Sequence, residues 1–358
     1  MKICVYAISK NEEKFVDRWV DSMQEADAIY VLDTGSTDKT VAKLKKRGVH
    51  VVSKKITPWR FDTARNLSLQ LVPEDTNICV CTDLDEVFQL NWRQELEKIW
   101  TEKVTRVRYH YNWSFDSYGN PAVNFYLDKI HNRQDYIWKH PVHEVVTNVS
   151  DNEVFVTTDK IVLNHYPDSQ KSRSSYLPLL ELSVQETPED DRNMHYLGRE
   201  YMYYKKWNQS IDTLIRHLHL KSATWKDERC ASMRFIARDY IHLKRYDEAK
   251  MWYEKAIQEA PYLREPWTEA ALLEYELEQY PEAIAHLKEA LAIQKNYKTY
   301  INEPYCYDGT IEDVLSVCLF HVGEKEEAYT YALQAQVLKP DDERIAQNVV
   351  LMKESLSK

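Results

Sequence analysis

Four short apolar segments in the first quarter of the chain constrain its fold most strongly. Helix-patterned stretches at residues 12–24, 38–47 and 61–71 separate these segments, which cover residues 2–7, 28–32, 49–53 and 78–82. Strands and helices that alternate in this way are typical of a parallel, doubly wound α/β sheet. Asn11 is a suitable N-cap for the first helix, and Ser36 or Thr37 is suitable for the second.

Three acids, Asp83, Asp85 and Glu86, directly follow the last of these apolar segments. In an open α/β sheet, ligands bind at the carboxyl ends of the strands, and the polar residues 9–12 and 33–38 end two further strands at the same edge. Asp83 and Asp85 can reach one ligand only if the chain turns after the strand. Carboxylate oxygens suit Mg²⁺ or Mn²⁺ bound to phosphates, so the acids predict a metal–phosphate site. A polar loop after a core strand is the alternative interpretation.

Past these acids the pattern changes from alternating elements to strands. Residues 91–100 form one more predicted helix, and strand-like alternation follows at residues 105–111, 123–131, 142–146, 154–156 and 161–165. We expect these strands to extend the sheet in antiparallel fashion. Two polar clusters in this part, at residues 138–144 and 164–166, carry candidate catalytic groups.

From about residue 174 onward the sequence is helical and repetitive. Tyr246, Ala249 and Ala256 recur 34 residues later as Tyr280, Ala283 and Ala290. A third copy begins at Glu326, and a weaker, earlier copy begins at Trp207. The pattern is similar to tetratricopeptide repeats, in which paired helices stack into a superhelix with a concave face.

The polar segment at residues 167–175 breaks the strand pattern. We therefore divide the chain into an α/β domain at residues 1–168 and an all-α repeat domain at residues 169–358. An insertion at residues 296–307 interrupts the repeats and carries four tyrosines. We favour packing of these tyrosines between repeats over a recognition surface, although aromatic side chains supply contact area at low entropic cost.

The composition narrows the classes of function. With a net charge of -10, the chain is not expected to bind nucleic acid or anionic membranes in general. The sequence has no run of 18 apolar residues, so no membrane span is expected. Its N-terminal residues enter a predicted strand at once and do not show the pattern of a signal peptide. The six cysteines have no disulfide-framework spacing. We expect them to be reduced and the protein to be cytoplasmic.

Four motifs in register resemble the family 2 glycosyltransferases of GT-A fold. They are Ala7-Ile8-Ser9-Lys10-Asn11-Glu12, Asp33-Thr34-Gly35-Ser36-Thr37-Asp38, Ala64-Arg65-Asn66 and Asp83-Leu84-Asp85-Glu86. Their order and their spacings both agree with the family, and the resemblance covers residues 1–165 or so. It implies a nucleotide-sugar donor, a divalent Mn²⁺ or Mg²⁺ ion, and inversion at the anomeric carbon.

The resemblance also implies a nucleotide-binding role for several residues. The strand end at residues 7–9 would pack along the nucleoside, with Glu12 and Leu84 in the same nucleotide-sugar site. Asp33, or Thr34 beside it, would hydrogen-bond the base. The alternative for Asp33 is a structural role in which its carboxylate caps the turn after the strand.

For the diphosphate and the metal, the resemblance points to four residues. Arg65 would meet the base or the phosphates, and its alternative is a salt bridge to Asp62 on its own helix. Asp83 would reach the ribose or a metal-bound water. Asp85 would bind the metal, as the second acid of a DXD motif, and His165 would be a further metal ligand. The alternative for His165 is an ordinary, partly buried side chain.

An inverting transfer needs a base that deprotonates the acceptor on the side opposite the leaving group. Glu144 and His143 are the candidates for this base, and His165 is a third rival for the position that faces the acids across the donor. An ion pair with Arg133 or Lys139 is the alternative for Glu144, and ordinary partial burial is the alternative for His143. A thiol acceptor ionises far more easily than a hydroxyl and needs no such base.

The arrangement of a GT-A domain before tetratricopeptide-like helices resembles bacterial peptide S- and O-glycosyltransferases. We therefore expect hexosyl or N-acetylhexosaminyl transfer from a UDP-sugar to a peptide, protein or glycan acceptor. The alternative is a non-catalytic repeat scaffold that binds a partner protein and carries a lapsed transferase domain. Exposed aromatic side chains on the repeats would permit a homodimer.

Overall fold

The computed structural model describes residues 1–168 and 175–357, which form two compact units. The first unit comprises Met1–Glu186 and Lys298–Tyr300, and the second comprises Thr187–Tyr297 and Ile301–Lys358. By its contacts, helix α5 (Tyr176–Glu186) belongs to the first unit, whereas the sequence division assigns it to the repeats. The predicted boundary after residue 168 adjoins residues 169–174, which lie outside the described residues, and it stays a prediction.

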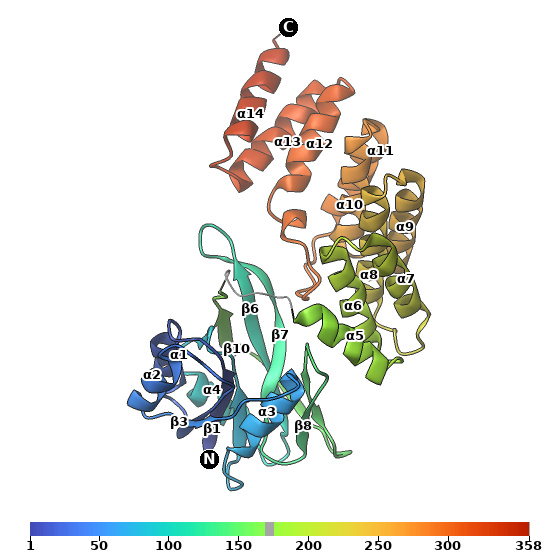
Figure 1. Ribbon diagram of the computed structural model, residues 1–358. Helices are drawn as coiled ribbons and strands as arrows, with labels where there is room; N and C mark the ends of the chain where they lie inside the picture. Colours follow the sequence, from blue (N-terminus) through green and yellow to red (C-terminus); the bar gives the residue numbers. More distant parts are fainter. Residues whose placement is uncertain (169–174, 358) are drawn as a thin grey trace. The chain divides into compact units, whose positions relative to one another are not determined.

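A mixed eight-stranded sheet forms the centre of the first unit (Figure 1). Its strand order is β3-β2-β1-β4-β7-β6-β10-β5. The strands are β1 (Ile3–Ser9), β2 (Ala28–Asp33), β3 (His50–Ser53), β4 (Ile78–Cys81), β5 (Glu86–Phe88), β6 (Arg106–Phe115), β7 (Pro121–Asn132) and β10 (Phe155–His165). β1 to β4 pair in parallel, as the alternation of strands and helices predicted.

Both faces of this sheet are covered, because successive residues of a strand point to opposite sides. Ile3, Val5 and Ala7 of β1 lie in one core, together with helices α1, α2 and α4. Cys4 and Tyr6 of the same strand lie in a second core, with α3 and the hairpin of β8 and β9. These elements are α1 (Val16–Met23), α2 (Thr40–Lys46), α3 (Phe61–Gln70), α4 (Trp92–Ile99), β8 (Tyr136–Lys139) and β9 (Val145–Asn148).

The part of the sheet beyond β4 differs from the predicted antiparallel extension. β7 is antiparallel to both β4 and β6, but β10 pairs in parallel with β6. β10 is one strand where two were predicted, with a register shift between Thr158 and Val162. The segment predicted at 142–146 does not join this sheet, since β9 pairs only with β8. Trp138 and Val146 of that hairpin are buried in the core beside α3, which accounts for its position.

The predicted caps of the first two helices are wrong. Asn11 has a φ of 55°, and its Oδ1 accepts a hydrogen bond from Thr37 N (2.7 Å), while α1 begins only at Val16. Ser36 Oγ accepts from Asn11 N (2.9 Å), and α2 begins at Thr40 without a side-chain cap. These polar side chains bond to one another across the loops that follow β1 and β2, so they are not available to the helices.

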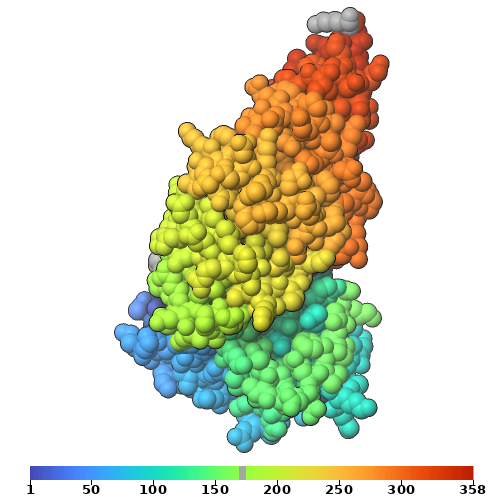
Figure 2. Space-filling view, turned by 90° about the vertical axis from the view of Figure 1, so that its right-hand side faces the viewer, coloured from blue at the N-terminus to red at the C-terminus, as the bar shows by residue number. Residues whose placement is uncertain are grey.

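The second unit is a run of helices in which each lies against the next, from α6 to α14 (Figure 1). The space-filling view shows the same succession as colours that pass from green to red along this unit (Figure 2). They are α6 (Asp191–Tyr203), α7 (Trp207–His219), α8 (Lys226–His242), α9 (Tyr246–Glu259), α10 (Arg264–Glu276), α11 (Tyr280–Ala292), α12 (Thr310–His321), α13 (Lys325–Leu338) and α14 (Glu343–Ser355). The repeat motifs begin at or next to the first residue of α7, α9, α11 and α13. Each motif therefore marks the second helix of a pair.

The two helices of each pair are joined by the same turn. Four residues at equivalent positions have a positive φ: Lys205 (58°), Lys244 (59°), Glu278 (59°) and Gly323 (89°). In each turn the next backbone N–H donates to the carbonyl five residues earlier, as from Lys206 N to Tyr201 O (2.9 Å). This is the Schellman arrangement, in which glycine is the usual left-handed residue.

Aromatic side chains lie between successive helix pairs. Trp207, at the start of α7, stacks on His242 at the end of α8, with ring centroids 4.2 Å apart. Tyr280, at the start of α11, stacks in the same way on His321 at the end of α12 (4.4 Å). The contact thus recurs two pairs later along the array.

The insertion between α11 and α12, which includes the short 3₁₀ helix η1 (Pro304–Cys306), packs on the repeats. Arg234 Nη2 of α8 donates to Ile301 O (3.1 Å), and Tyr305 Oη donates to Glu269 Oε1 of α10 (3.1 Å). The ring of Tyr297 lies 5.2 Å from that of Tyr262. These contacts support the packing interpretation for Tyr297 and Tyr305.

All six cysteines are buried and free, as expected from their spacing. Among the helices of residues 1–168 and 175–357, none is long and apolar enough to cross a membrane.

Candidate active site

The ends of β1 and β2 form the first part of the site, because Ser9 and Asp33 are paired in the sheet register. Asp33 is buried, and its carboxylate accepts hydrogen bonds from Ser9 Oγ (3.2 Å), Gly35 N (3.2 Å) and Ser36 N (3.1 Å). These bonds close the turn after β2, so Asp33 does cap that turn. Ser36 Oγ also donates to Asp33 Oδ1, so these bonds fill the about four acceptor positions of the carboxylate, and a bond from a nucleotide base would have to replace one of them.

The other residues expected to line the nucleoside lie around this turn. Ala7 and Thr34 are buried, and Thr34 Oγ1 donates to the carbonyl of Ser9 (3.0 Å). Glu12 is also buried, while Ile8 is partly exposed. Of these residues Ile8 therefore offers the most surface to a ligand.

The acids after β4 form a tight turn. Asp83 N donates to Glu86 Oε2 (2.8 Å), and Glu86 N donates to Asp83 O (3.1 Å). The side chain of Asp83 is 35% exposed and that of Asp85 is 14% exposed, whereas Leu84 between them is buried. The chain thus turns where the sequence analysis required a turn, and both aspartates are accessible.

Two charged residues that the sequence analysis did not assign lie beside this turn. Glu86 is 2% exposed and accepts a hydrogen bond from Tyr111 Oη (2.8 Å), and its burial raises its pKa. Lys129 of β7 places Nζ 3.6 Å from Asp83 Oδ2 and 3.9 Å from Glu86 Oε1. Burial lowers the pKa of Lys129, but the two acids outweigh burial and raise it. Glu86 could have been assigned from the sequence, because it belongs to the motif at residues 83–86. Lys129 could not, because a single lysine in an alternating strand does not indicate a site.

Arg65 of α3 bridges two acids. Its Nη2 donates to Asp83 Oδ1 (2.5 Å) and its Nε donates to Glu144 Oε1 (2.9 Å), while its guanidinium lies 5.4 Å from the ring centre of Trp138. The side chain is 3% exposed; burial lowers its pKa, but Asp83 and Glu144 outweigh burial and raise it. The suggested salt bridge from Arg65 to Asp62 is wrong.

Arg60 takes the place of Arg65 as the partner of Asp62, with Arg60 Nη2 2.8 Å from Asp62 Oδ2. Asp62 lies in the first turn of α3, two residues after its N-cap Arg60, so this pair forms locally at the start of the helix. The alternative partners of Glu144, Arg133 and Lys139, are likewise replaced by Arg65.

Asp85 and His165 lie together, although they are far apart in the sequence. β5 and β10 are antiparallel, with Glu86 opposite His165, and Tyr166 N donates to the carbonyl of Asp85 (2.9 Å). This pairing places His165 Nε2 3.6 Å from Asp85 Oδ2. The two residues that the resemblance implied as metal ligands are therefore neighbours.

The hydrogen bonds of His165 fix which of its ring nitrogens faces Asp85. Its Nδ1 lies 3.0 Å from the backbone carbonyl of Trp113, and its ring stacks on the Trp113 ring at 4.4 Å. A carbonyl can only accept, so Nδ1 carries the hydrogen and Nε2 faces Asp85. This is the orientation of a metal-binding histidine held by a backbone partner. Burial lowers the pKa of His165, but Asp85 outweighs burial and raises it.

Glu144 and His143 lie between β8 and β9. His143 has a φ of 51°, and its ring stacks on Tyr176 of α5, with centroids 5.7 Å apart. Glu144 is held by Arg65, and through Arg65 it is linked to Asp83. The two candidates for the base thus differ in surroundings: one is tied to the acid turn, and the other is packed against an aromatic ring.

The donor atoms at this edge fit a divalent cation. Asp85 Oδ2 and His165 Nε2 provide one oxygen and one nitrogen at a spacing of 3.6 Å. Imidazole nitrogen is a ligand that suits Mn²⁺ better than Mg²⁺. Arg65 and Lys129 pair with Asp83, Glu86 and Glu144, and Asp85 is paired with His165. A bound cation would add positive charge beside Asp85.

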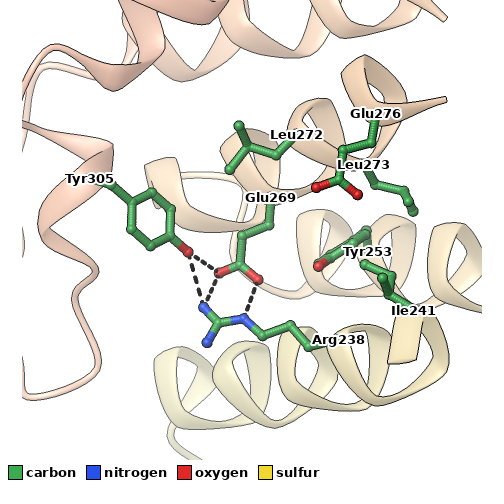
Figure 3. Close-up of a pocket in the computed structure, with 8 residues that line it drawn as sticks. All are labelled: Arg238, Ile241, Tyr253, Glu269, Leu272, Leu273, Glu276 and Tyr305. Carbon is green, nitrogen blue, oxygen red and sulfur yellow. Dashed lines mark hydrogen bonds and ion pairs between the residues drawn. The ribbon is translucent and has the colours of Figure 1, made fainter. Parts of the chain in front are cut away.

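The second unit contains a cavity of about 180 Å³ between its helices (Figure 3). Its residues are Arg238, Ile241, Tyr253, Glu269, Leu272, Leu273, Glu276 and Tyr305. Arg238 donates to both carboxylate oxygens of Glu269 (2.8 and 2.9 Å) and to Tyr305 Oη (3.0 Å). Ile241 and Leu272 supply a partly exposed apolar wall. The space is smaller than that of ordinary cofactor sites and is better suited to a side chain.

Comparisons with known proteins agree with this geometry. Residues 4–147 match the model of glycosyl transferase family 2, and residues 236–262, in α8 and α9, match that of a tetratricopeptide repeat. The chain therefore contains a family 2 glycosyltransferase domain with a GT-A-like mixed sheet, followed by helices of the tetratricopeptide class. This domain supports glycosyltransferase activity in general.

Solved structures similar to the helical part are known, and no curated protein gives a significant match. One is YrrB, described as a TPR protein with an unusual peptide-binding site (16% identity, TM-score 0.40, 50% of this chain and 84% of that chain). Another is MamA (12% identity, TM-score 0.37, 48% and 85%). A third is TTC0263, a thermophilic TPR protein in Thermus thermophilus (18% identity, TM-score 0.36, 50% and 89%).

Proposed function

We propose that the protein is an inverting, metal-dependent glycosyltransferase that moves a hexosyl or N-acetylhexosaminyl group from a UDP-sugar to an acceptor. The observation that carries the proposal is the approach of His165 Nε2 to Asp85 Oδ2 (3.6 Å) at the edge of a family 2 domain. The diphosphate of a nucleotide sugar carries two negative charges and gains a third as the bond to the sugar breaks, which favours a cation there.

Asp85 and His165 are the residues that would hold Mn²⁺ or Mg²⁺. The ion supplies positive charge that stabilises the departing diphosphate. Arg65 and Lys129 flank Asp83, and both are permanently charged, so they add to the positive potential at the same place. Asp83 keeps a partly exposed carboxylate that can accept hydrogen bonds from ribose hydroxyls.

A hydroxyl acceptor must lose its proton on the face opposite the leaving diphosphate. We assign this proton to Glu144, with His143 as the alternative base. Arg65 Nε holds one oxygen of Glu144 at 2.9 Å, which fixes the orientation of the carboxylate. A carboxylate held in this way loses little freedom when it accepts a proton. The ring of His143 is instead stacked on Tyr176.

The acceptor is a peptide or protein in preference to a free glycan. Tetratricopeptide helices are binding elements for proteins, and the cavity near Arg238 offers an apolar wall beside a polar group. The cavity would take one side chain of the acceptor, so the helices select the acceptor and the family 2 domain performs the transfer.

The first test is hydrolysis of nucleotide sugars without an acceptor. Wild-type protein is incubated with a panel of UDP- and GDP-sugars and Mn²⁺ or Mg²⁺, and the released nucleoside diphosphate is measured. We expect release from a UDP-sugar that chelation abolishes. Asp85→Asn is expected to lower the rate about 100-fold, the usual scale for loss of one group that stabilises a leaving charge.

Asp151→Asn is the matched control, because Asp151 is exposed and lies outside the acid turn. It should hydrolyse the donor at the wild-type rate. Absence of donor binding across the whole panel would support the scaffold alternative instead. Fast hydrolysis in the presence of chelator would contradict the metal dependence but not the proposed glycosyl transfer.

A further inference from the structure

Two buried histidines face one another in the first helices of the repeat unit. His195 of α6 and His217 of α7 are both 0% exposed. Ser232 of α8 lies between them, with its Oγ 2.8 Å from His195 Nδ1 and 3.0 Å from His217 Nδ1. Three helices therefore meet at one polar cluster in a part of the molecule that the proposed transfer does not use.

This hydrogen-bonded chain does not use the second nitrogen of His217. His217 Nε2 is buried and has no hydrogen-bond partner among the residues that the structure describes. Glu228 Oε1 of α8 lies 3.5 Å away, a distance longer than a good N–H···O bond. If His217 Nδ1–H donates to Ser232, and the Ser232 hydroxyl donates to His195, then Nε2 presents a lone pair toward Glu228. A metal-binding imidazole typically donates a hydrogen bond from its other ring nitrogen in this way.

A third donor completes the cluster. Asp191, at the start of α6, provides a carboxylate oxygen, and the ligand atoms of Asp191, His217 and Glu228 all lie within 4.8 Å of one another. Each of α6, α7 and α8 thus contributes one ligand. A single ion of ordinary metal–ligand distance, about 2.0–2.2 Å, can reach three atoms at this spacing after a small side-chain movement.

We propose that Asp191, His217 and Glu228 form a structural site for Zn²⁺ that joins the first three helices of the repeat unit. One imidazole and two carboxylates are a known type of zinc ligand set, whereas Mg²⁺ and Ca²⁺ prefer oxygen alone. The two carboxylates balance the charge of a divalent ion. The site is independent of the proposed sugar transfer.

The competing explanation is an ion pair between a protonated His217 and Glu228. That arrangement requires two charges in a buried place, joined at a distance that is not a hydrogen bond. An ion bound between them would instead give the buried Nε2 of His217 a partner without two uncompensated charges, which is why the metal explains more of the observed geometry.

The test uses the full-length protein, stripped with a chelator and then dialysed. Zinc binding is followed by calorimetry and by metal content per chain, and thermal unfolding is measured with and without Zn²⁺. We expect one zinc ion per chain that Asp85→Asn does not remove, and a rise in Tm on zinc addition. His217→Gln should weaken this binding at least about 10- to 100-fold and abolish the Tm rise.

His219→Gln is the control, because His219 lies on the same helix but is not buried in the cluster. It should keep both the zinc and the Tm rise. Asp191→Asn is a second ligand variant at a partly exposed position, and it serves if His217→Gln does not fold. Bound Co²⁺ should also show visible absorption bands in wild type that Asp191→Asn weakens. The proposal would be overturned if the ligand variants bound as much zinc as wild type and showed the same Tm rise. It would also be overturned if the only zinc bound by wild-type protein were the ion that Asp85→Asn removes.

Discussion

Arg65 connects two acids to which the proposed reaction gives different tasks. Its guanidinium donates to Asp83 on the donor side and to Glu144, the proposed base. Both contacts use the fixed fork of an arginine, which a lysine could not reproduce. The same residue therefore holds both of the groups that the proposal assigns to the two substrates.

At the residue scale, Glu144→Gln separates a base from a group that only positions Arg65. Glutamine keeps an oxygen that accepts from Arg65 Nε, but it takes up no proton at neutral pH. We therefore expect kcat for transfer to a hydroxyl acceptor to fall roughly 10²–10⁴-fold, the usual contribution of a general base. The KM for the UDP-sugar should stay within about threefold of wild type.

His143→Gln provides the comparison for this experiment, since His143 is the rival base in the same loop. It should leave kcat within about tenfold of wild type if Glu144 takes the proton. A raised donor KM with an unchanged kcat in Glu144→Gln would show that Glu144 positions Arg65 and that the base is elsewhere.

The strand-end residues were accessible to sequence analysis, whereas their partners were not. Asp33 and Asp83 follow strands whose order is fixed by the β-α-β pattern, so the edge they share could be predicted. Lys129 and Glu144 come from the irregular extension, where strand pairing depends on tertiary contacts and not on a local pattern. The nearest sequence neighbour, Asp62, was a poor guide to the partner of Arg65 because Arg60 is closer to it.

At the element scale, the packing of α6 against α7 depends on Gly198. A Cβ added at this glycine would lie 2.5 Å from Cγ of Leu214, which is fully buried. We expect Gly198→Ala to destabilise the protein by about 1–3 kcal/mol, the usual cost of an overpacked core. Chemical denaturation of wild type and variant would measure the difference.

Adding Leu214→Ala tests whether the overlap between the new Cβ and Leu214 causes the loss of stability. The double variant Gly198→Ala, Leu214→Ala should lose less stability than the sum of the two single changes, because the smaller side chain makes room for the added methyl. Additive losses would mean that the cost of Gly198→Ala arises elsewhere in α6.

The helices themselves were predictable where a motif marks them. The repeat pattern has an aromatic residue at the start of a helix, and α7, α9 and α11 begin at Trp207, Tyr246 and Tyr280. The caps of α1 and α2 were not predictable in this way, since Asn11 and Ser36 bond to each other across two loops. Propensity describes what a side chain can cap, but the contacts between loops decide what it does.

At the scale of the whole molecule, the proposal assigns chemistry to one unit and acceptor choice to the other. Ile241→Ser and Leu272→Ser change the apolar wall of the cavity in the repeats and leave the acid turn untouched. We expect both variants to hydrolyse the UDP-sugar at the wild-type rate. Transfer to a peptide acceptor, selected from a peptide library with wild-type protein, should fall about tenfold, as expected for loss of one apolar contact.

Val350→Ser is the control, because Val350 is an exposed apolar residue of α14 outside the cavity. It should transfer to the same peptide as wild type does. Equal transfer by the cavity variants would remove this cavity from acceptor binding, and a parallel loss of hydrolysis would indicate a general loss of structure.

The four turns within the helix pairs share one left-handed backbone position, yet only Gly323 fills it with the residue that suits it. Lys205, Lys244 and Glu278 hold the same conformation against the contact between Cβ and the backbone, at roughly 1 kcal/mol or more each. Each of these three positions therefore carries a conformational cost that glycine would remove. Replacing Lys205, Lys244 and Glu278 with glycine is therefore a route to a more stable variant. None of these three residues is proposed for catalysis.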